Sequence, residues 1–241
     1  MKHRNSVEFE VTGDYGLFAD PVTRVGGEKF TYQIPTYEAL KGILQSIYWK
    51  PTFIWIIDEM RVMNPIQTET KGIRPIRYYN DKNDLSYYTY LKNCRYQVRA
   101  HFIWNENRPE LSQDRNENKH HNIARRMIER GGRRDIFLGT RECQGYVNSC
   151  VFGEGRSFYE EIEELSFGMM YHGITYADEA YSKETEGKMS VRLWQAVMRK
   201  GIIAFCPPWE CVHRPIREME IKPFGEVLMN FSREDEEGVM R

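Results

Sequence analysis

The sequence predicts an α+β protein, with a ferredoxin-like βαββαβ domain followed by a smaller antiparallel β domain. Two amphipathic helical stretches lie within residues 1–155, and each is flanked by strand-like segments. No internal repeat with a fixed period occurs in the 241 residues, so a solenoid is excluded. After residue 155 the chain becomes acidic and strand-rich. We therefore expect two domains, residues 1–155 and residues 156–241.

The first strand, helix and second strand follow from local residue patterns. Residues 7–11 alternate apolar and acidic side chains, which is typical of a half-buried strand. Thr36 is suited to cap a helix that runs to about Trp49, where a Lys-Pro pair ends it. The apolar residues of this helix recur every three or four positions: Tyr37, Leu40, Ile43, Leu44, Ile47 and Tyr48. Residues 53–62 begin with a continuous apolar run and predict a buried strand.

The second half of the pattern begins after a long polar region. Residues 64–93 contain prolines, glycines and clustered Asn and Asp, so we expect irregular structure there. Residues 96–104 alternate as a strand does, and residues 120–130 form an amphipathic helix that Gly131-Gly132 ends. Two short strands are expected within residues 136–147. RNA-recognition modules share this order of elements.

The C-terminal part predicts mostly strands. Strand-like segments occur at residues 167–176, 202–205 and 217–221. The acidic run Glu234-Asp235-Glu236-Glu237 is expected to be a solvated tail.

The whole chain is nearly neutral, with 34 Lys and Arg against 35 Asp and Glu, which taken alone argues against nucleic-acid binding. The charge is nevertheless divided unevenly. Residues 1–150 hold 23 basic and 18 acidic side chains, whereas residues 151–241 hold 11 and 17. The stretch from Arg115 to Arg141 has eight basic and three acidic residues and can supply the entire basic excess.

Arginine accounts for seven of those eight basic residues, and its planar guanidinium suits bidentate contact with phosphate. The alternative is an ordinary solvated helix face followed by a basic turn. The candidate RNA-binding residues are Arg115, His121, Arg125, Arg126, Arg133, Arg134 and Arg141.

Several protein classes can be set aside. No apolar run is long enough to span a bilayer, and the N-terminus lacks a secretory apolar region. Five cysteines without a Cys-x-x-Cys pair are expected to stay reduced in the cytoplasm. Walker A, Gly-x-Ser-x-Gly and His-Glu-x-x-His patterns are absent from the sequence.

The sequence gives no reason to expect a metal or another cofactor. Cys206, Cys211 and His213 have the spacing of half a zinc site, but no second half follows. Asp58-Glu59 is a single acidic pair, which is too little for a two-metal centre. If the chain is an enzyme, we expect acid–base chemistry without a metal.

The densest group of chemically useful residues is Lys119-His120-His121 at a predicted helix start. A fixed cation and imidazoles beside a helix N-terminus favour an anionic substrate such as a phosphate ester. Imidazole can exchange protons near pH 7, and the lysine can stabilise charge on phosphorus. The alternative is that both histidines are surface or capping residues. From its spacing alone, Tyr48 is expected in the core.

Several long segments of the chain resemble the CRISPR-associated Cas5 family, and most closely its type I-C branch, subtype d. They include Gly13-Asp-Tyr-Gly-Leu-Phe, Pro35-Thr-Tyr-Glu-Ala-Leu-Lys-Gly-Ile, Ser46-Ile-Tyr-Trp-Lys-Pro-Thr, Arg115-Asn-Glu-Asn-Lys-His and Gly131-Gly-Arg-Arg-Asp-Ile-Phe-Leu-Gly-Thr-Arg-Glu-Cys-Gln-Gly-Tyr-Val. The resemblance runs from about residue 7 to 155 and resumes near residues 191 and 214.

The resemblance implies a ferredoxin-like domain of the repeat-associated RNA-binding (RAMP) superfamily. It implies an enzyme that cuts CRISPR repeat RNA at the base of its hairpin without a metal. The enzyme then stays on the 5′ handle, together with the other subunits of the type I-C surveillance complex. By motif, the catalytic set is Tyr48, Lys119 and His120. Because His121 is adjacent, either imidazole can be the one that acts.

Three functional hypotheses follow. The leading one is a metal-independent endoribonuclease, in which 2′-OH attack leaves a cyclic phosphate and a 5′-OH. The second is a subunit that binds the RNA handle without cutting it. The third is double-stranded DNA binding, because a basic surface attracts either duplex.

Overall fold

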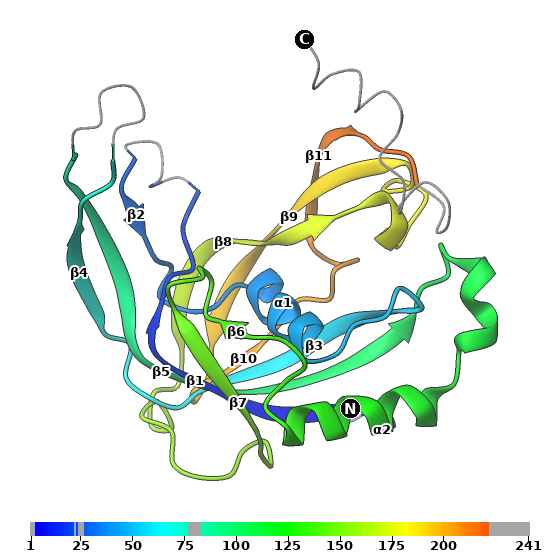
Figure 1. Ribbon diagram of the computed structural model, residues 1–241, viewed down its shortest axis with the longest axis horizontal. Helices are drawn as coiled ribbons and strands as arrows, with labels where there is room; N and C mark the ends of the chain where they lie inside the picture. Colours follow the sequence, from blue (N-terminus) through cyan, green and yellow to red (C-terminus); the bar gives the residue numbers. More distant parts are fainter. Residues whose placement is uncertain (1–2, 22, 24–26, 77–82, 222–241) are drawn as a thin grey trace.

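The computed structural model describes residues 3–21, 23, 27–76 and 83–221, which form a mixed α/β protein with two largely antiparallel sheets (Figure 1). The first sheet contains β1 (Val7–Gly16), β2 (Lys29–Phe30), β3 (Phe53–Val62), β4 (Thr68–Ile73), β5 (Ser86–Trp104), β6 (Ile136–Phe137), β7 (Gln144–Ser149) and β10 (Ile202–Ala204). The second contains β8 (Leu165–Thr175), β9 (Lys188–Met198) and β11 (Val212–Glu218). The helices are α1 (Tyr37–Ile47) and α2 (Glu117–Glu129), with 3-10 helices at Pro109–Asp114 and Ala177–Glu179. The predicted acidic tail lies outside the described residues.

β5 is the central strand of the first sheet, whose order is β10-β3-β5-β1-β7-β6. β1 and β3 both pair with it antiparallel, so that Ala100 lies opposite Val7 on one side and Ile57 on the other. All three side chains are buried, and they form part of the core under the helices. In the chain, α1 lies between β2 and β3, and α2 lies between β5 and β6, so each helix connects strands of this sheet.

The two helices are confirmed, with small changes at their ends. The Thr36 hydroxyl caps α1 by accepting the Ala39 N–H at 3.2 Å, and the predicted apolar stripe of α1 is buried. α2 begins at Glu117, three residues earlier than expected, because Asn116 accepts the Lys119 N–H at 3.0 Å. Gly131 and Gly132 have φ values of +81° and +107°, which glycine adopts without strain, and they end the helix.

The expectation of irregular structure throughout residues 64–93 is wrong. β4 and the first part of β5 pair antiparallel, with Thr70 opposite Thr89, and the two strands project from the body of the sheet (Figure 1). The β4 side chains alternate between exposed and half-buried, so β4 has no apolar face to reveal it in the sequence. Asn93, with a φ of +51°, also interrupts the alternation within β5.

The second sheet packs against α1, which therefore lies between the two sheets (Figure 1). Arg192 of β9 forms an ion pair of 3.0 Å with Glu38 of α1, and the rings of Tyr37 and His172 stack 4.0 Å apart. Two of the expected C-terminal strands correspond to β8 and β10, the third is displaced to β11, and β9 was not expected. β10 pairs with β3 and so belongs to the first sheet.

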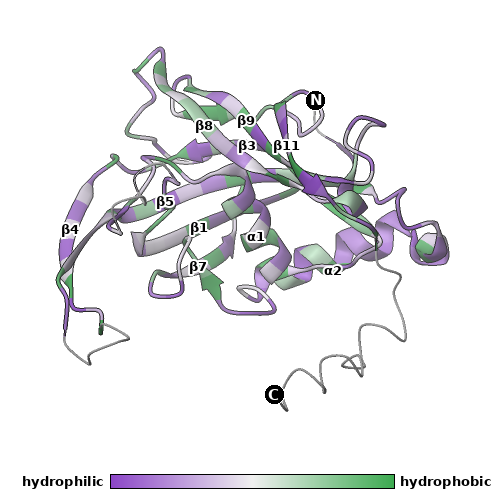
Figure 2. Cartoon of the chain, turned by 90° about the horizontal axis from the view of Figure 1, so that it is seen from above, coloured by the Kyte–Doolittle hydropathy of each residue, from purple (hydrophilic) through white to green (hydrophobic). Residues whose placement is uncertain are grey.

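The helices differ in how much of their surface is covered. α1 is largely buried, whereas most of α2 carries hydrophilic colours in Figure 2. α2 therefore presents a polar, basic surface beside β1 and β7.

No helix among the described residues combines the length and apolarity needed to cross a membrane.

Candidate functional site

Tyr48 and His120, which are 72 residues apart in the chain, are in direct contact. Tyr48 is the C-cap of α1, where the chain turns into extended structure leading to β3. His120 lies in the first turn of α2. The Tyr48 hydroxyl and His120 Nδ1 are 2.8 Å apart. The fold thus brings together two of the three residues that the family resemblance singles out.

The His120 ring is held on every side. Its side chain has 0% exposure and is surrounded by the aromatic rings of Phe53, Phe102 and Trp104. Nε2 lies 2.7 Å from the backbone oxygen of Asp114, which can only accept a hydrogen bond. Nε2 therefore carries the proton, and in the neutral ring Nδ1 accepts a hydrogen bond from the Tyr48 hydroxyl.

Asp114 joins the third predicted residue to this pair. Its Oδ1 accepts a hydrogen bond from the Lys119 ammonium group, and its Oδ2 accepts one from the Thr52 hydroxyl at 3.0 Å. Asp114 ends the 3-10 helix Pro109–Asp114, in which no residue is buried. We call Tyr48, Asp114, Lys119 and His120 the candidate site.

Two acidities in the candidate site are shifted. The hydrogen bond from Lys119 is the largest cause that lowers the pKa of Asp114, and Thr52 and His120 add to it, so the carboxylate stays charged at neutral pH. Burial raises the pKa of Tyr48 to about 12, with a further rise from the nearby Asp114 charge and an opposing effect from Arg133. Tyr48 is therefore a neutral hydroxyl at neutral pH.

These contacts make the candidate site closed. Both nitrogens of His120 are occupied, and the charge of Lys119 is balanced by Asp114. A phosphate can approach from the side of Lys119, whose side chain is 49% exposed. An anion that pairs with Lys119 and with Nε2 of His120 has to displace Asp114 from both.

A row of exposed arginines continues from the candidate site along α2 and into the loop that follows. The row consists of Arg125, Arg126, Arg130, Arg133 and Arg134. No carboxylate oxygen of the described residues lies within 4.0 Å of any of these guanidinium groups. They line two adjacent hollows, one of about 550 Å³ that includes Lys119 and one of about 520 Å³ beside β7. We call this surface the arginine groove.

The other predicted RNA-binding residues have different surroundings. Arg115 is mostly buried; it pairs with Glu106 at 2.8 Å and donates to a backbone oxygen, so it holds the loop before α2. Arg141 lies outside the groove, with its guanidinium 6.0 Å from the centre of the Phe137 ring. His121 donates from Nε2 to the Ser6 backbone oxygen at 3.0 Å.

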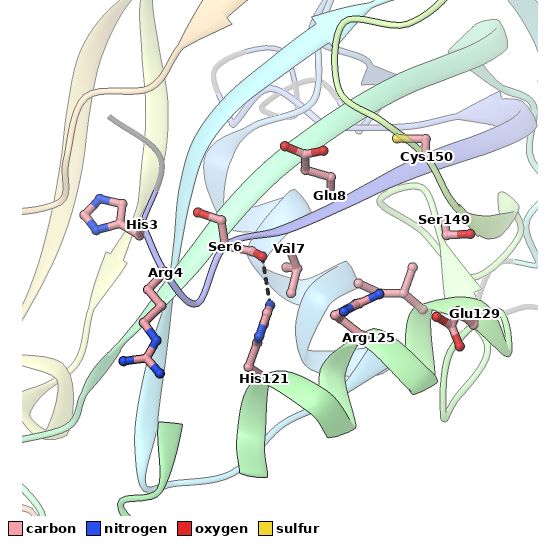
Figure 3. Close-up of a pocket in the computed structure, with 11 residues that line it drawn as sticks. His3, Arg4, Ser6, Val7, Glu8, His121, Arg125, Glu129, Ser149 and Cys150 are labelled. Carbon is pink, nitrogen blue, oxygen red and sulfur yellow. Dashed lines mark hydrogen bonds between the residues drawn. The ribbon is translucent and has the colours of Figure 1, made fainter. Parts of the chain in front are cut away.

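His121 also lines a pocket of about 370 Å³ between α2 and the start of β1 (Figure 3). Arg4 and His3 lie at one end of this pocket and Glu129 at the other (Figure 3). His121 is thus more accessible than its neighbour His120, but it has no contact with Tyr48. Of these two histidines, His120 is the one whose ring contacts the Tyr48 hydroxyl.

Sequence reasoning did not assign a role to Asp114 or Thr52. Asp114 is five residues from Lys119, so it could be noticed as part of the charged cluster, but its carboxylate contacts depend on the turn between two helices. Thr52 is 62 residues from Asp114 and carries no local signal. Within the described chain, ligand-capable side chains gather away from this site, at His3, Asp58 and His101.

Comparisons with known proteins agree on one protein family. The family Cas_Cas5d, described as CRISPR-associated protein (Cas_Cas5), matches residues 6–206. A crystal structure described as a CRISPR-associated protein is 35% identical, covers 87% of this chain and 96% of its own, and superimposes with a TM-score of 0.72. A functionally uncharacterized protein of Streptococcus mutans is 38% identical over the same shares, with a TM-score of 0.71.

A curated relative matches a shorter region. The CRISPR pre-crRNA endoribonuclease Cas5d of Mannheimia succiniciproducens is 38% identical over 66 residues, which is 27% of this chain and 28% of that protein. The chain thus aligns with little more than a quarter of the length of this relative.

Proposed function

Because the chain belongs to the CRISPR-associated Cas5 family, we propose that it is an endoribonuclease that cleaves CRISPR repeat RNA at the base of its hairpin. The contact between Tyr48 and His120, with Lys119 on the same turn of α2, carries this proposal. The relative named pre-crRNA endoribonuclease supports the substrate class. The arginine groove supplies a surface for the RNA backbone beside the candidate site.

The proposed reaction needs no metal. The ribose 2′-OH attacks the scissile phosphorus, the bond to the 5′ oxygen breaks, and the products are a 2′,3′-cyclic phosphate and a 5′-OH. His120 takes the 2′-OH proton or gives a proton to the leaving 5′ oxygen, and Lys119 stabilises charge on the phosphorane. The Tyr48 hydroxyl can either donate or accept, so it can hold the ring in either tautomer.

Substrate access is part of the proposed mechanism. The phosphate displaces the Asp114 carboxylate from Lys119 and takes its place as the anionic partner. This frees Nε2 of His120 from the Asp114 backbone oxygen. The 3-10 helix before Asp114 has no buried residue, so it can move at little cost in core packing.

We also propose the finer features of fold, location and assembly that the family implies. The strand order β7-β1-β5-β3, with a helix before β3 and another before β7, supports a ferredoxin-like domain of the RAMP superfamily. The second domain begins near residue 156, and β10 returns from it to the first sheet. The protein stays on the 5′ handle in a type I-C surveillance complex. Its five unpaired cysteines support a cytoplasmic location.

The test is incubation of the full chain with a synthetic repeat hairpin in EDTA, followed by analysis of the product ends. We expect cutting in EDTA, a cyclic phosphate (or 3′-phosphate) and a 5′-OH. A deoxy substitution at the scissile 2′ position should abolish cutting. Cutting that stops with the chelator, or that survives the deoxy substitution, contradicts the mechanism.

Variants test the assignment of the residues. Lys119→Ala and His120→Ala should lose cleavage while RNA affinity stays within about tenfold, because the arginine groove carries binding. His121→Ala is the matched control and should cut at a rate near that of the wild type. Unchanged cleavage in Lys119→Ala and His120→Ala contradicts the assignment. Thermal melting of each variant shows that a lost activity is not lost folding.

The closed candidate site favours one alternative, a subunit that holds the RNA handle without cutting it. The complete burial of His120 and the pairing of Lys119 with Asp114 are the observations behind it. Tight binding of the hairpin with no product under any condition would support this alternative. The same assay with a double-stranded DNA competitor tests DNA binding through the arginine groove.

A further inference from the structure

We propose that His3, Asp58 and His101 bind a divalent transition-metal ion, with zinc as the first candidate. Within the described residues these three form a group whose ligand-capable atoms all lie within 4.8 Å of one another. Two imidazole nitrogens and a carboxylate oxygen are a ligand set typical of zinc and its neighbours. None of the three residues belongs to the candidate site or to the arginine groove.

The group lies on the opposite face of the first sheet from the candidate site. Neighbouring residues of a strand point to opposite faces, and Phe102 packs against the His120 ring. His101, the preceding residue of β5, therefore points away from that ring. The proposed ion is thus separate from RNA cleavage, which we propose to be metal-independent.

A β-bulge aims Asp58 at this position. The pairing of β3 with β5 shifts register between Ile57 and Glu59, so Asp58 is the extra residue. Its backbone oxygen accepts the Phe205 N–H at 3.0 Å. Bulges of this kind turn a side chain away from the regular alternation of a strand and are frequent at functional sites. The carboxylate of Asp58 is therefore set by the backbone.

His101 and Asp58 lie close enough to share an ion. The His101 side chain is 7% exposed, and Nδ1 lies 2.8 Å from Oδ1 of Asp58. An ionised carboxylate only accepts hydrogen bonds, so Nδ1 donates to it when no ion is bound. An ion that takes the place of this proton is bound by Nδ1 of His101 and by the carboxylate of Asp58, and the proton is released to solvent.

Asp58 also has an oxygen that needs a partner. Among the described residues, Oδ2 of Asp58 is shielded from solvent and has no hydrogen bond. A buried carboxylate oxygen without a partner is costly, and an ion is one of the few explanations for it. The unpartnered oxygen is independent of the clustering of the histidines and points to the same ligand.

The local charge also suits a cation. The nearest positive side chain along β5, Arg99, is already engaged by Glu8 at 3.2 Å and by Glu59. These two carboxylates balance more than its charge. An ion next to Asp58 therefore meets a net negative surrounding.

His3 can complete the site only if its ring changes orientation. It lies on an exposed turn before β1, where its backbone oxygen accepts the Ser6 N–H at 3.2 Å. Its ring stacks on that of His101 with centroids 3.7 Å apart and planes inclined by 17°. A metal ion lies in the plane of each imidazole that binds it, so the exposed ring must exchange stacking for coordination. Binding would then fix the turn that carries Arg4 and Ser6 into the pocket beside α2 (Figure 3).

The other candidate for zinc in this chain is less suited. The Cys211 thiol is directed at the backbone oxygens of Cys206 and Pro207, and burial raises its pKa. His213 Nε2 lies 2.8 Å from the Pro208 oxygen. Zinc binds the thiolate, which a raised pKa disfavours.

The test is titration of the tag-free full chain, stripped with EDTA, with Zn²⁺ by calorimetry and with Co²⁺ by visible absorption. We expect one ion per chain in the wild type. His3→Ala, Asp58→Asn and His101→Ala should each weaken the affinity by about tenfold or more. The matched control His213→Ala should bind like the wild type.

Three outcomes would overturn the proposal: a wild-type chain that binds no ion, affinity that persists in His101→Ala and Asp58→Asn, or affinity that is lost in His213→Ala. His3→Ala keeps the result interpretable because the side chain is exposed and its removal leaves the core intact. At the same Zn²⁺ concentration, the rise in melting temperature should be smaller in His3→Ala than in the wild type. RNA cleavage in EDTA, measured in parallel, tests the proposed function separately.

Discussion

Asp114 holds the candidate site in its closed state. Its carboxylate accepts hydrogen bonds from Lys119 and Thr52, and its backbone oxygen accepts one from His120. Because its pKa is lowered, it remains an anion at neutral pH and occupies the place where a phosphate is expected. A carboxylate that must be displaced by substrate lowers the affinity for that substrate.

Asp114→Asn is therefore expected to bind the repeat hairpin several-fold more tightly. The released Lys119 charge becomes available to RNA, so the plot of log affinity against log salt should steepen by about one contact. The measurement is the dissociation constant over a range of salt concentrations. Glu117→Gln, which removes an equal charge from the same helix start without touching Lys119, is the control. An unchanged salt slope in Asp114→Asn would contradict the displacement step.

Part of the candidate site could be predicted from the residues, and part could not. Lys119 and His120 stand out because a cation and an imidazole are adjacent at a helix start. Tyr48 looks like a core residue and is one, with 4% exposure; its hydroxyl matters only because His120 lies beside it. Partners that are 72 residues apart cannot be paired from spacing alone, so this contact needed the family resemblance or the fold.

At the scale of elements, one glycine fixes the turn between β6 and β7. Gly139 has a φ of +93°, and a Cβ there would lie 2.0 Å from the Leu17 backbone oxygen. The neighbouring residue Leu138 accepts the Leu17 N–H at 2.9 Å, which holds the two chains together. The position therefore requires both the conformational freedom and the small size of glycine.

Gly139→Ala should destabilise the protein more than Gly153→Ala does. Gly153 has a similar φ of +96°, but nothing lies within 4 Å of its added Cβ, so it reports the backbone strain alone. We expect a loss of about 1 kcal/mol for Gly153→Ala and at least about 2 kcal/mol more for Gly139→Ala. Urea unfolding of both variants provides the measurement. Equal losses would show that the Leu17 contact is not restrictive.

The elements that were predicted correctly carry a clear apolar signal, and those that were missed do not. α1 has apolar residues at the helical period, β3 begins with a continuous apolar run, and both are buried against the core. β4 and β9 lack such a signal for different reasons. β4 is held by pairing with β5 and is largely solvated. β9 buries every second residue from Ser190 to Met198, but the fully buried Arg192 among them breaks the apolar pattern. Pairing between distant strands and buried ion pairs are tertiary effects.

At the scale of the whole molecule, a buried polar network joins the second sheet to α1. Arg192 contacts Glu38 at 3.0 Å, Thr175 at 2.7 Å and Nδ1 of His172 at 3.1 Å. Burial first, and then the Arg192 charge, lowers the pKa of His172 to about 3. His172 is therefore neutral at pH 7, with Nε2 donating to the Cys206 oxygen at 2.9 Å.

This lowered pKa predicts acid sensitivity. Below about pH 6.5 the unfolded chain takes up a proton at His172 that the folded chain refuses. The stability is complete above about pH 6.5 and is lost as the pH falls towards the folded pKa, by up to about 1.4 kcal/mol per pH unit. Urea unfolding at pH 7 and pH 5 should show a smaller pH effect in His172→Gln than in the wild type. His213→Gln is the control, and an identical pH effect in His172→Gln would contradict this origin.

The uneven charge predicts how RNA binding depends on salt. Among the described residues, the arginines of the arginine groove have no carboxylate oxygen within 4.0 Å, so replacing them should weaken binding and flatten the salt slope. Arg133→Ala/Arg134→Ala is expected to lower the slope by about two contacts. Arg156→Ala/Lys200→Ala, which removes two exposed charges from the acidic part of the chain, should leave the slope unchanged. Filter binding over a salt series distinguishes the two double variants.

The return of β10 to the first sheet has a consequence for synthesis on the ribosome. β3 is the edge of that sheet until Ile202–Ala204 pair with it. A nascent chain that has emerged only as far as residue 155 therefore displays an open strand edge, and the outer side of α1 lacks its cover. Open edges of this kind recruit other chains. The part of the chain after residue 155 thus acts as a built-in protection against aggregation, and slow translation before residue 202 prolongs the vulnerable period.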